Sequence, residues 1–226
     1  FFLATDPPSD AERERQRLRG DIRVLDEYRQ RHLWKIVVKD GKETRVSGGD
    51  YYVFEYKISA NGQRIILSRR PTSLPVDSDK MELWNIGVDG GAPIQVTNNK
   101  IPEEDGALAP DGSSVLFLAR ANGRQEPYYN ENVFLVPPSG GPARLLMPDF
   151  PYEVLRAEWA ADSKSIWMVV NMGVHSELFQ VDLASRQPRQ ITDGQHAVVT
   201  WNLTGDRHVL MLDEPTRIGD IWTLAP

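Results

Sequence analysis

The chain of 226 residues contains no cysteine, which excludes disulfide bonds and cysteine-ligated zinc sites. Chains without cysteine occur in reducing and in oxidising compartments, so a cytoplasmic and a periplasmic location both stay open. No apolar run approaches the roughly 18 residues that cross a bilayer, and we expect no membrane contact. Residues 1–4 are too short for the core of a signal peptide, and the first residue is not methionine, so we expect a longer parent protein.

Catalytic motifs are missing as well. The chain has no Gly-x-Ser-x-Gly elbow, no His-Glu-x-x-His motif, no phosphate-binding loop and no dinucleotide-binding glycine pattern. We therefore predict no catalytic residue, no metal site and no cofactor in these residues. The histidines are few and scattered, and we expect each to be hydrogen-bonded or exposed; they are His32, His175, His196 and His208. The net charge of −6 argues against a nucleic-acid partner, because phosphate binding needs a basic face.

What the sequence does contain is a repeated order of short strands and turns. An apolar strand, a polar turn and a short second strand are followed by a third strand, a second turn and a strongly apolar fourth strand. The first strands are Leu33-Trp34-Lys35-Ile36, Leu83-Trp84-Asn85-Ile86, Val133-Phe134-Leu135-Val136 and Leu178-Phe179-Gln180-Val181. The second turns are Ala60-Asn61-Gly62, Pro110-Asp111-Gly112, Ala161-Asp162-Ser163 and Thr204-Gly205-Asp206. Residues of these types tolerate the positive φ that tight hairpins require.

The spacing of the second turns indicates the architecture. Positions 61, 111, 162 and 205 lie 50, 51 and 43 residues apart. Four short strands at this period are typical of propeller blades, which bury both faces of each small sheet against neighbouring blades. We predict an all-β fold, a β-propeller with four-stranded blades of the TolB or WD type. About four complete blades are expected, with half-blades at each end that either pair to close a five-bladed ring or belong to a larger ring.

We expect residues 1–226 to form one propeller domain. The repeats cover approximately 31–72, 81–122, 132–173 and 176–215, with partial blades at 1–6 and 219–226 and a helical insertion at 7–30. A capping box at Ser9-Asp10-Ala11-Glu12 and the good helix formers after it predict one short charged helix near residues 10–19, ended by Gly20. We expect the arginines of this helix to be solvated and balanced by its glutamates.

Two clusters are candidates for substrate binding. The acids Glu103 and Glu104, followed by Asp105, could hold a cationic group such as the amino terminus of a peptide. The alternative for these acids is a solvated surface loop. The aromatic pair Tyr128 and Tyr129 either lines the rim of the propeller or packs between blades, and we expect packing.

The order of these motifs resembles the propeller of the prolyl oligopeptidase family of serine peptidases, in its bacterial acylaminoacyl-peptidase and dipeptidyl-peptidase-like branch. The segments that carry the resemblance are Phe2-Leu3-Ala4 with Asp6-Pro7-Pro8 and the charged helix, His32-Leu33-Trp34, Glu126-Pro127-Tyr128-Tyr129-Asn130, and Gly219-Asp220-Ile221-Trp222. In that family a propeller of seven or eight blades covers a C-terminal α/β-hydrolase domain with a Ser-Asp-His triad, and it admits short peptides but not folded proteins.

The resemblance implies that the chain is a truncated, non-catalytic gate whose partners are the hydrolase domain of its own parent chain and short peptide substrates. Such an isolated arc could also self-associate through its uncovered blade faces. Some dipeptidyl members hold the substrate amino terminus with paired glutamates; Glu103 and Glu104 are a pair, but without the aromatic context of that motif. Two alternatives remain: a free-standing TolB-like propeller that binds other proteins, and a propeller enzyme with its own site at the channel mouth.

Overall fold

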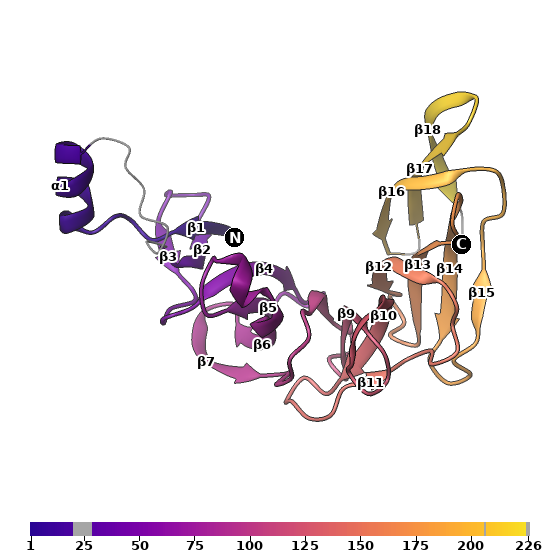
Figure 1. Cartoon of the computed structure of the whole chain (residues 1–226), viewed down its shortest axis with the longest axis horizontal. Helices are drawn as coiled ribbons and strands as arrows, with labels where there is room; N and C mark the ends of the chain where they lie inside the picture. Colours follow the sequence, from indigo (N-terminus) through magenta and orange to yellow (C-terminus); the bar gives the residue numbers. More distant parts are fainter. Residues whose placement is uncertain (20–28, 206, 225–226) are drawn as a thin grey trace.

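A computed structural model of the chain describes residues 1–19, 29–205 and 207–224, in which the strands form five successive blades along an open arc (Figure 1). Blade I contains β1 (Phe2–Thr5), β2 (Arg31–Ile36) and β3 (Glu43–Arg45). Blade II contains β4 (Tyr52–Ile58), β5 (Arg64–Arg70), β6 (Glu82–Gly87) and β7 (Gly90–Gln95). Blade III contains β8 (Glu104–Leu108), β9 (Val115–Ala121), β10 (Pro127–Val136) and β11 (Arg144–Leu145).

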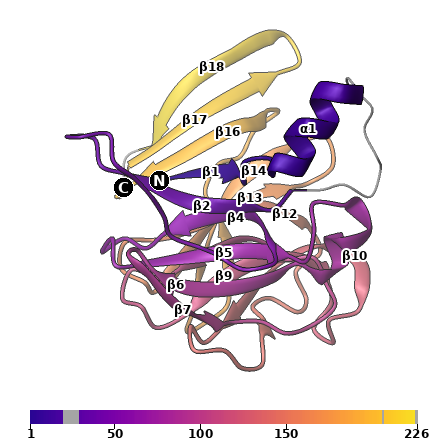
Figure 2. The same cartoon turned by 90° about the vertical axis from the view of Figure 1, so that its left-hand side faces the viewer.

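Blades IV and V complete the arc. Blade IV contains β12 (Glu153–Trp159), β13 (Ser165–Asn171), β14 (Ser176–Asp182) and β15 (Pro188–Gln190), and blade V contains β16 (Ala197–Thr204), β17 (Arg207–Glu214) and β18 (Arg217–Leu224). Neighbours within each blade are antiparallel, and Figure 2 shows β4 to β7 following one another across blade II. A single parallel pair, Ser176 with Ala197, joins β14 to β16 and so links blade IV to blade V.

The sequence copies and the blades are out of phase by two strands. All four predicted copies of four strands are present, with β1 before them and β18 after them. Each copy supplies the outer two strands of one blade and the inner two strands of the next. The predicted count of about four blades was a count of copies. In the residues that the structure describes, three blades have four strands and two have three, and the parallel pair merges blades IV and V into one seven-stranded sheet. Among the described residues β1 pairs with β2 and β18 pairs with β17, so the two ends do not close a ring.

The second turn of each copy has the conformation that its residues predicted. Gly62, Gly112, Ser163 and Gly205 have φ values of 66°, 76°, 60° and 62°. No atom lies within 4 Å of a side chain built at Gly62, so backbone conformation and not space favours glycine there. The Asn61 and Asp111 side chains accept hydrogen bonds from the backbone N–H two residues on, at 3.0 and 2.9 Å, which is the turn-forming role expected of them.

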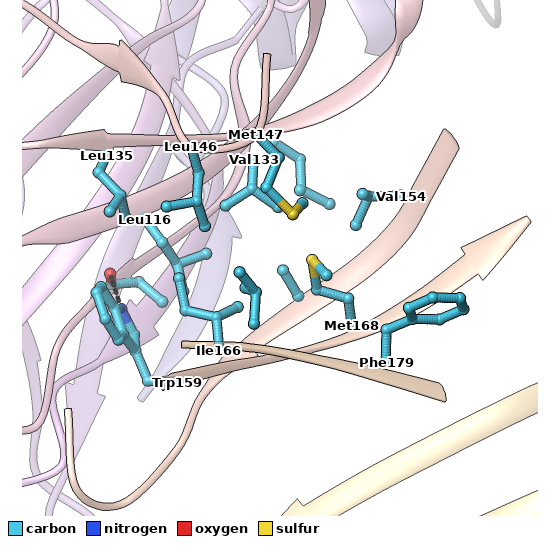
Figure 3. Packing of buried hydrophobic residues seen from close by; sticks show 14 of the residues in the cluster. Leu116, Val133, Leu135, Leu146, Met147, Val154, Trp159, Ile166, Met168 and Phe179 are labelled. Atoms are coloured by element: carbon cyan, nitrogen blue, oxygen red, sulfur yellow. Dashed lines mark hydrogen bonds between the residues drawn. The ribbon is translucent and has the colours of Figure 1, made fainter. Parts of the chain in front are cut away.

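Within the described part of the chain, four apolar cores fill the spaces between successive blades. The largest joins blades III and IV, where Leu116 and Leu135 of one sheet meet Ile166 and Met168 of the next (Figure 3). Within it the indole N–H of Trp159 donates to the backbone oxygen of Ala107 at 3.0 Å, so the one polar atom of that ring is satisfied. Similar cores lie between blades I and II, II and III, and IV and V.

The predicted helix is α1 (Asp10–Arg19), which stands outside the sheets at the end of blade I (Figure 1). Its capping box is formed: the Ser9 N–H donates to Glu12 at 2.6 Å, and the Glu12 N–H donates to the Ser9 hydroxyl at 3.2 Å. Its stop at Gly20 lies outside the described residues. The extension between β5 and β6 contains the 3-10 helix η1 (Pro75–Lys80).

Candidate functional site

The innermost strand of a propeller blade faces the central axis, and in blades II to V this strand carries a β-bulge. The register slips by one residue in β4, β8, β12 and β16, at Phe54, Asp105-Gly106, Leu155 and Val199. Phe54, Leu155 and Val199 are 37%, 45% and 53% exposed. A bulge interrupts the free edge of a strand and turns side chains outward, so these positions are presented to whatever occupies the axis.

A line of ion pairs crosses the inner strands. Lys57 of β4 lies 3.3 Å from the carboxylate of Asp105 on β8 and 3.5 Å from that of Glu158 on β12. Glu158 also pairs with Arg156 at 3.1 Å, and Arg156 donates to the backbone oxygen of Trp201 on β16 at 2.5 Å. Four blades are therefore tied together by charged side chains on the axial side of the arc.

The structure separates the two predicted acids. Glu103 is fully enclosed; Thr97 bonds one of its carboxylate oxygens, and the Asn99 amide donates to the other at 2.5 Å. Burial is the main cause that raises the pKa of Glu103 to about 8. The Thr97 hydroxyl also accepts a hydrogen bond from the backbone N–H of Leu83 at 2.8 Å, so Glu103 is part of a buried hydrogen-bond network. Substrate contact by Glu103 stays a prediction.

A related arrangement recurs two blades later, in a different copy of the repeat. Thr192 accepts the Leu178 N–H at 2.9 Å and donates to the buried carboxylate of Glu177 at 2.6 Å. In both blades a threonine that accepts a strand N–H also bonds a buried glutamate. The position equivalent to Glu177 is Glu82, which directly precedes Leu83 as Glu177 precedes Leu178.

Glu104 is exposed, as the solvated alternative expected, but it begins strand β8 and does not lie in a loop. It contributes to an acidic patch with Asp105, Glu131 on β10 and Glu153 on β12. Partial burial, together with the nearby carboxylates of Glu104, Glu153 and Asp105 and against the opposing charge of Arg120, raises the pKa of Glu131 to about 7. This patch, at the junction of blades III and IV, could hold a cationic group. Substrate contact by Glu104 stays a prediction.

The aromatic pair extends strand β10 instead of forming a loop. Tyr129 is 52% exposed, so our expectation that it packs between blades was wrong. The adjoining register shift between Pro127 and Asn132 accounts for this, because a bulged strand rotates its side chains out of the sheet. The side chain of Tyr128 lies outside the described part of the structure, and contact of either tyrosine with a substrate stays a prediction.

Two of the four histidines are neighbours, because His175 and His196 directly precede the parallel pair Ser176–Ala197. His32 and His208 are buried; His32 lies 3.3 Å from the Ser47 hydroxyl, and the Trp201 indole N–H donates to His208 at 3.1 Å. His196 pairs with Glu177 at 2.9 Å. In the described ranges no three acidic or histidine side chains are grouped as metal ligands would be. Nor does any described helix have the length and apolar composition to cross a membrane.

Sequence reasoning missed Lys57, Glu131 and the Arg156–Glu158 pair. A signal existed for part of this set: each lies on or beside a strand whose alternating apolar residues are buried, so a charged residue there must face outward or find a partner. Which partner it finds depends on blade packing, and Lys57 and Glu158 are too far apart in the sequence for any local pattern to connect them.

Comparison with known proteins places this geometry in a familiar fold. No family model matches the chain. Dipeptidyl-peptidase 5 of Porphyromonas gingivalis is 23% identical over 155 residues, which make up 67% of this chain and 22% of that protein. The acylaminoacyl peptidase of Pyrococcus horikoshii superposes on 98% of the chain, and on 34% of its own, with a TM-score of 0.67 at 13% identity. The chain has a β-propeller fold.

Two further structures support the fold. TolB of Acinetobacter baumannii matches 85% of the chain and 50% of its own, with a TM-score of 0.55 and 15% identity. The β-propeller domain of the trilobed protease of Pyrococcus furiosus matches 86% of the chain and 56% of its own, with a TM-score of 0.59 and 11% identity. The resemblance to peptidase propellers that the motifs indicated is thus confirmed as a likeness of fold. The chain spans about a fifth of the length of its peptidase relative.

Proposed function

We propose that this chain is the non-catalytic propeller of a serine peptidase of the prolyl oligopeptidase family, and that it restricts access of peptides to an α/β-hydrolase domain of the same parent protein. The observation that carries the proposal is the sequence match to Dipeptidyl-peptidase 5, combined with the superposition of nearly the whole chain on an acylaminoacyl peptidase. The axial ion pairs support it, because blades tied together around a channel make a rigid barrier to folded proteins.

The finer part of the proposal concerns the acidic patch. Glu104, Glu131 and Glu153 lie at the junction of blades III and IV. Partial burial is the main cause of the raised pKa of Glu131, and repulsion by the other two carboxylates adds to it. A cationic group brought among them relieves that repulsion. We propose that the patch receives the free amino group of a short peptide, the group that a dipeptidyl peptidase must recognise. An acylaminoacyl activity would not use it, since an acylated amino terminus carries no charge.

The first test is the coding sequence after Pro226. We expect roughly 200–300 further residues with a strand-to-helix Gly-x-Ser-x-Gly elbow followed by aspartate and histidine in that order. The parent protein should cleave dipeptide chromogenic substrates and leave folded proteins intact, and alanine at the elbow serine should abolish cleavage. A stop codon shortly after Pro226, or an unrelated domain there, would overturn the proposal.

The acidic patch needs its own variant. In the parent protein, Glu131→Gln should raise KM for a dipeptide substrate with a free amino terminus by about ten-fold and leave an N-acetylated substrate unaffected. Glu43→Gln, on the exposed outer strand β3, is the matched control. If Glu131→Gln changed KM equally for both substrates, the patch would not bind the amino group. The proposed gating role of the propeller would be unaffected by that result.

The second candidate is a free-standing TolB-like propeller that binds other proteins, favoured by the match to TolB. It predicts that the coding sequence carries no hydrolase domain, and that the purified protein retains a protein partner on its rim. The two candidates therefore separate on the same sequence determination.

A further inference from the structure

Three arginines stack on aromatic rings where β4 begins and β5 ends. Arg31 of β2 and Arg70 of β5 both lie over Tyr52, and Arg70 also lies near the Phe54 ring. The third is Arg69 of β5, which contacts two other rings. Arginines stacked on aromatic rings can bind anionic ligands. The ring faces attract the guanidinium cation and leave its N–H edges free to donate hydrogen bonds.

Two of these arginines already have hydrogen-bond acceptors. Arg31 donates to the backbone oxygen of Val53 at 2.8 Å and to that of Phe54 beside it. Arg70 donates to the Ser78 hydroxyl at 2.7 Å and to the Ser73 backbone oxygen at 3.0 Å. Arg31 therefore supports the β4 bulge, and Arg70 fastens the loop that contains η1.

Arg69 differs from both. Its guanidinium carbon lies 3.4 Å from the centre of the Trp84 ring and 3.9 Å from that of Tyr51. Trp84 belongs to β6 and Tyr51 precedes β4, and these strands flank β5 on opposite sides, so the two rings hold the guanidinium between them. The Tyr51 hydroxyl interacts with it, but across the part of the chain that the structure describes no carboxylate pairs with it. Partial burial lowers its pKa, the mark of a cation that has lost water without gaining an anion.

We propose that Arg69, held between Tyr51 and Trp84, is a binding site for a peptide carboxylate. A guanidinium with both faces covered presents its N–H fork in one plane, and a carboxylate accepts two parallel hydrogen bonds from such a fork. The charge is partly desolvated and has the neutral Tyr51 hydroxyl but no carboxylate as its partner among the described residues, so pairing with an anion is more favourable than at an exposed arginine. The rings supply apolar surface for the rest of the ligand. The site lies on blade II, apart from the acidic patch, and does not depend on the proposed function.

The test is isothermal titration of the purified protein with three N-acetylated peptides. The first is tetra-alanine with a free carboxyl terminus, the second is the same peptide amidated, and the third is amidated with glutamate at its second position. We expect at least one of the two acids to bind about ten-fold or more tightly than the neutral amide. Preference for the first identifies a carboxyl terminus as the ligand, and preference for the third identifies an acidic side chain.

The variant Arg69→Lys keeps the charge but lacks the fork, and should weaken binding of the preferred acid about ten-fold. Arg189→Lys is the matched control: Arg189 lies on the outer strand β15, is exposed and donates to Gln180 at 2.8 Å. Equal binding of acids and amide by the wild-type protein, which requires no variant to fold, would overturn the proposal. So would undiminished binding by a folded Arg69→Lys protein.

Discussion

Glu103 and Glu104 are neighbours in the sequence, yet one is fully enclosed and the other exposed. Successive residues of an extended chain point to opposite sides, so the start of β8 divides the pair. The sequence could predict that acids lie here, but not that a strand starts among them, because aspartate and glycine at the next two positions have low strand propensity. The residue types alone therefore could not decide which of the two glutamates is exposed and which is buried.

Glu103 makes stability depend on pH. Its pKa is raised by burial from 4.5 to about 8, so between these values the folded chain binds more protons than the unfolded one. Its contribution to stability is thus fully present below about pH 4.5 and is lost as the pH rises through about 8. We expect Glu103→Gln to lose less stability than the wild type between pH 5 and pH 8 in urea denaturation. Glu43→Gln should keep the wild-type slope, and an unchanged slope in Glu103→Gln would contradict the assignment.

Among the elements, those with a strong local pattern were predicted and those shaped by neighbours were not. The charged helix follows from its capping box, and the second turns follow from residues that accept positive φ. Strand β8 and the first half of β10 were missed. Both contain bulges at blade junctions, and their pairing is fixed by β9, whose seven residues are almost all buried. A tertiary partner can thus impose strand structure on a sequence of low propensity.

The stacked pair Phe117 and Phe134 tests how strongly β9 and β10 hold a blade together. The two rings lie 5.3 Å apart at 13° and are fully buried in the core between blades II and III. Phe117→Ala should reduce the free energy of unfolding by about 3–5 kcal/mol, through lost burial and a residual cavity. Chemical denaturation measures this, and Phe54→Ala, on the exposed β4 bulge, should cost about 1 kcal/mol or less. Similar losses in both variants would mean that the core is not where the stability resides.

At the scale of the whole molecule, the repeat predicted the architecture because every blade must bury its apolar faces against neighbouring blades. Apolar residues of neighbouring sheets meet between every pair of blades, and the spacing of turns is enough to indicate this. The contacts along the axis are different. Lys57 reaches past blade III to Glu158 on blade IV, a contact that depends on the curvature of the arc and that no periodicity reveals.

Lys57 and Glu158 should be energetically coupled. Their side chains are 30% and 25% exposed, so the pair is less screened than one on the open surface. A double-mutant cycle with Lys57→Met and Glu158→Gln should give a coupling free energy of about 0.5–1 kcal/mol, which falls as salt is added. The pair Lys35–Asp89, whose aspartate is 86% exposed, should show less. A coupling of zero at low salt would show that the axial ion pairs do not join the blades.

The far side of blade V predicts self-association of the purified chain. Strand β18 is an edge strand on which Ile218, Ile221 and Trp222 are 98%, 75% and 49% exposed. Exposed apolar edges of this kind favour pairing with a second copy. Sedimentation velocity should show concentration-dependent oligomers that Trp222→Lys shifts towards monomer. Val38→Lys, on a 96% exposed turn residue of blade I, should leave the distribution unchanged; a monomeric wild type would contradict the prediction.

The two-strand offset between sequence copies and blades has a consequence for how such a chain changes over generations. A copy such as residues 81–122 gives its first half to one sheet and its second half to the next. Unequal recombination that inserts or removes one copy therefore leaves every remaining sheet with its full set of strands, and only the number of blades changes. The number of blades can therefore change by one in a single recombination event. Because the number of blades sets the width of the axial channel, selection can act on that width.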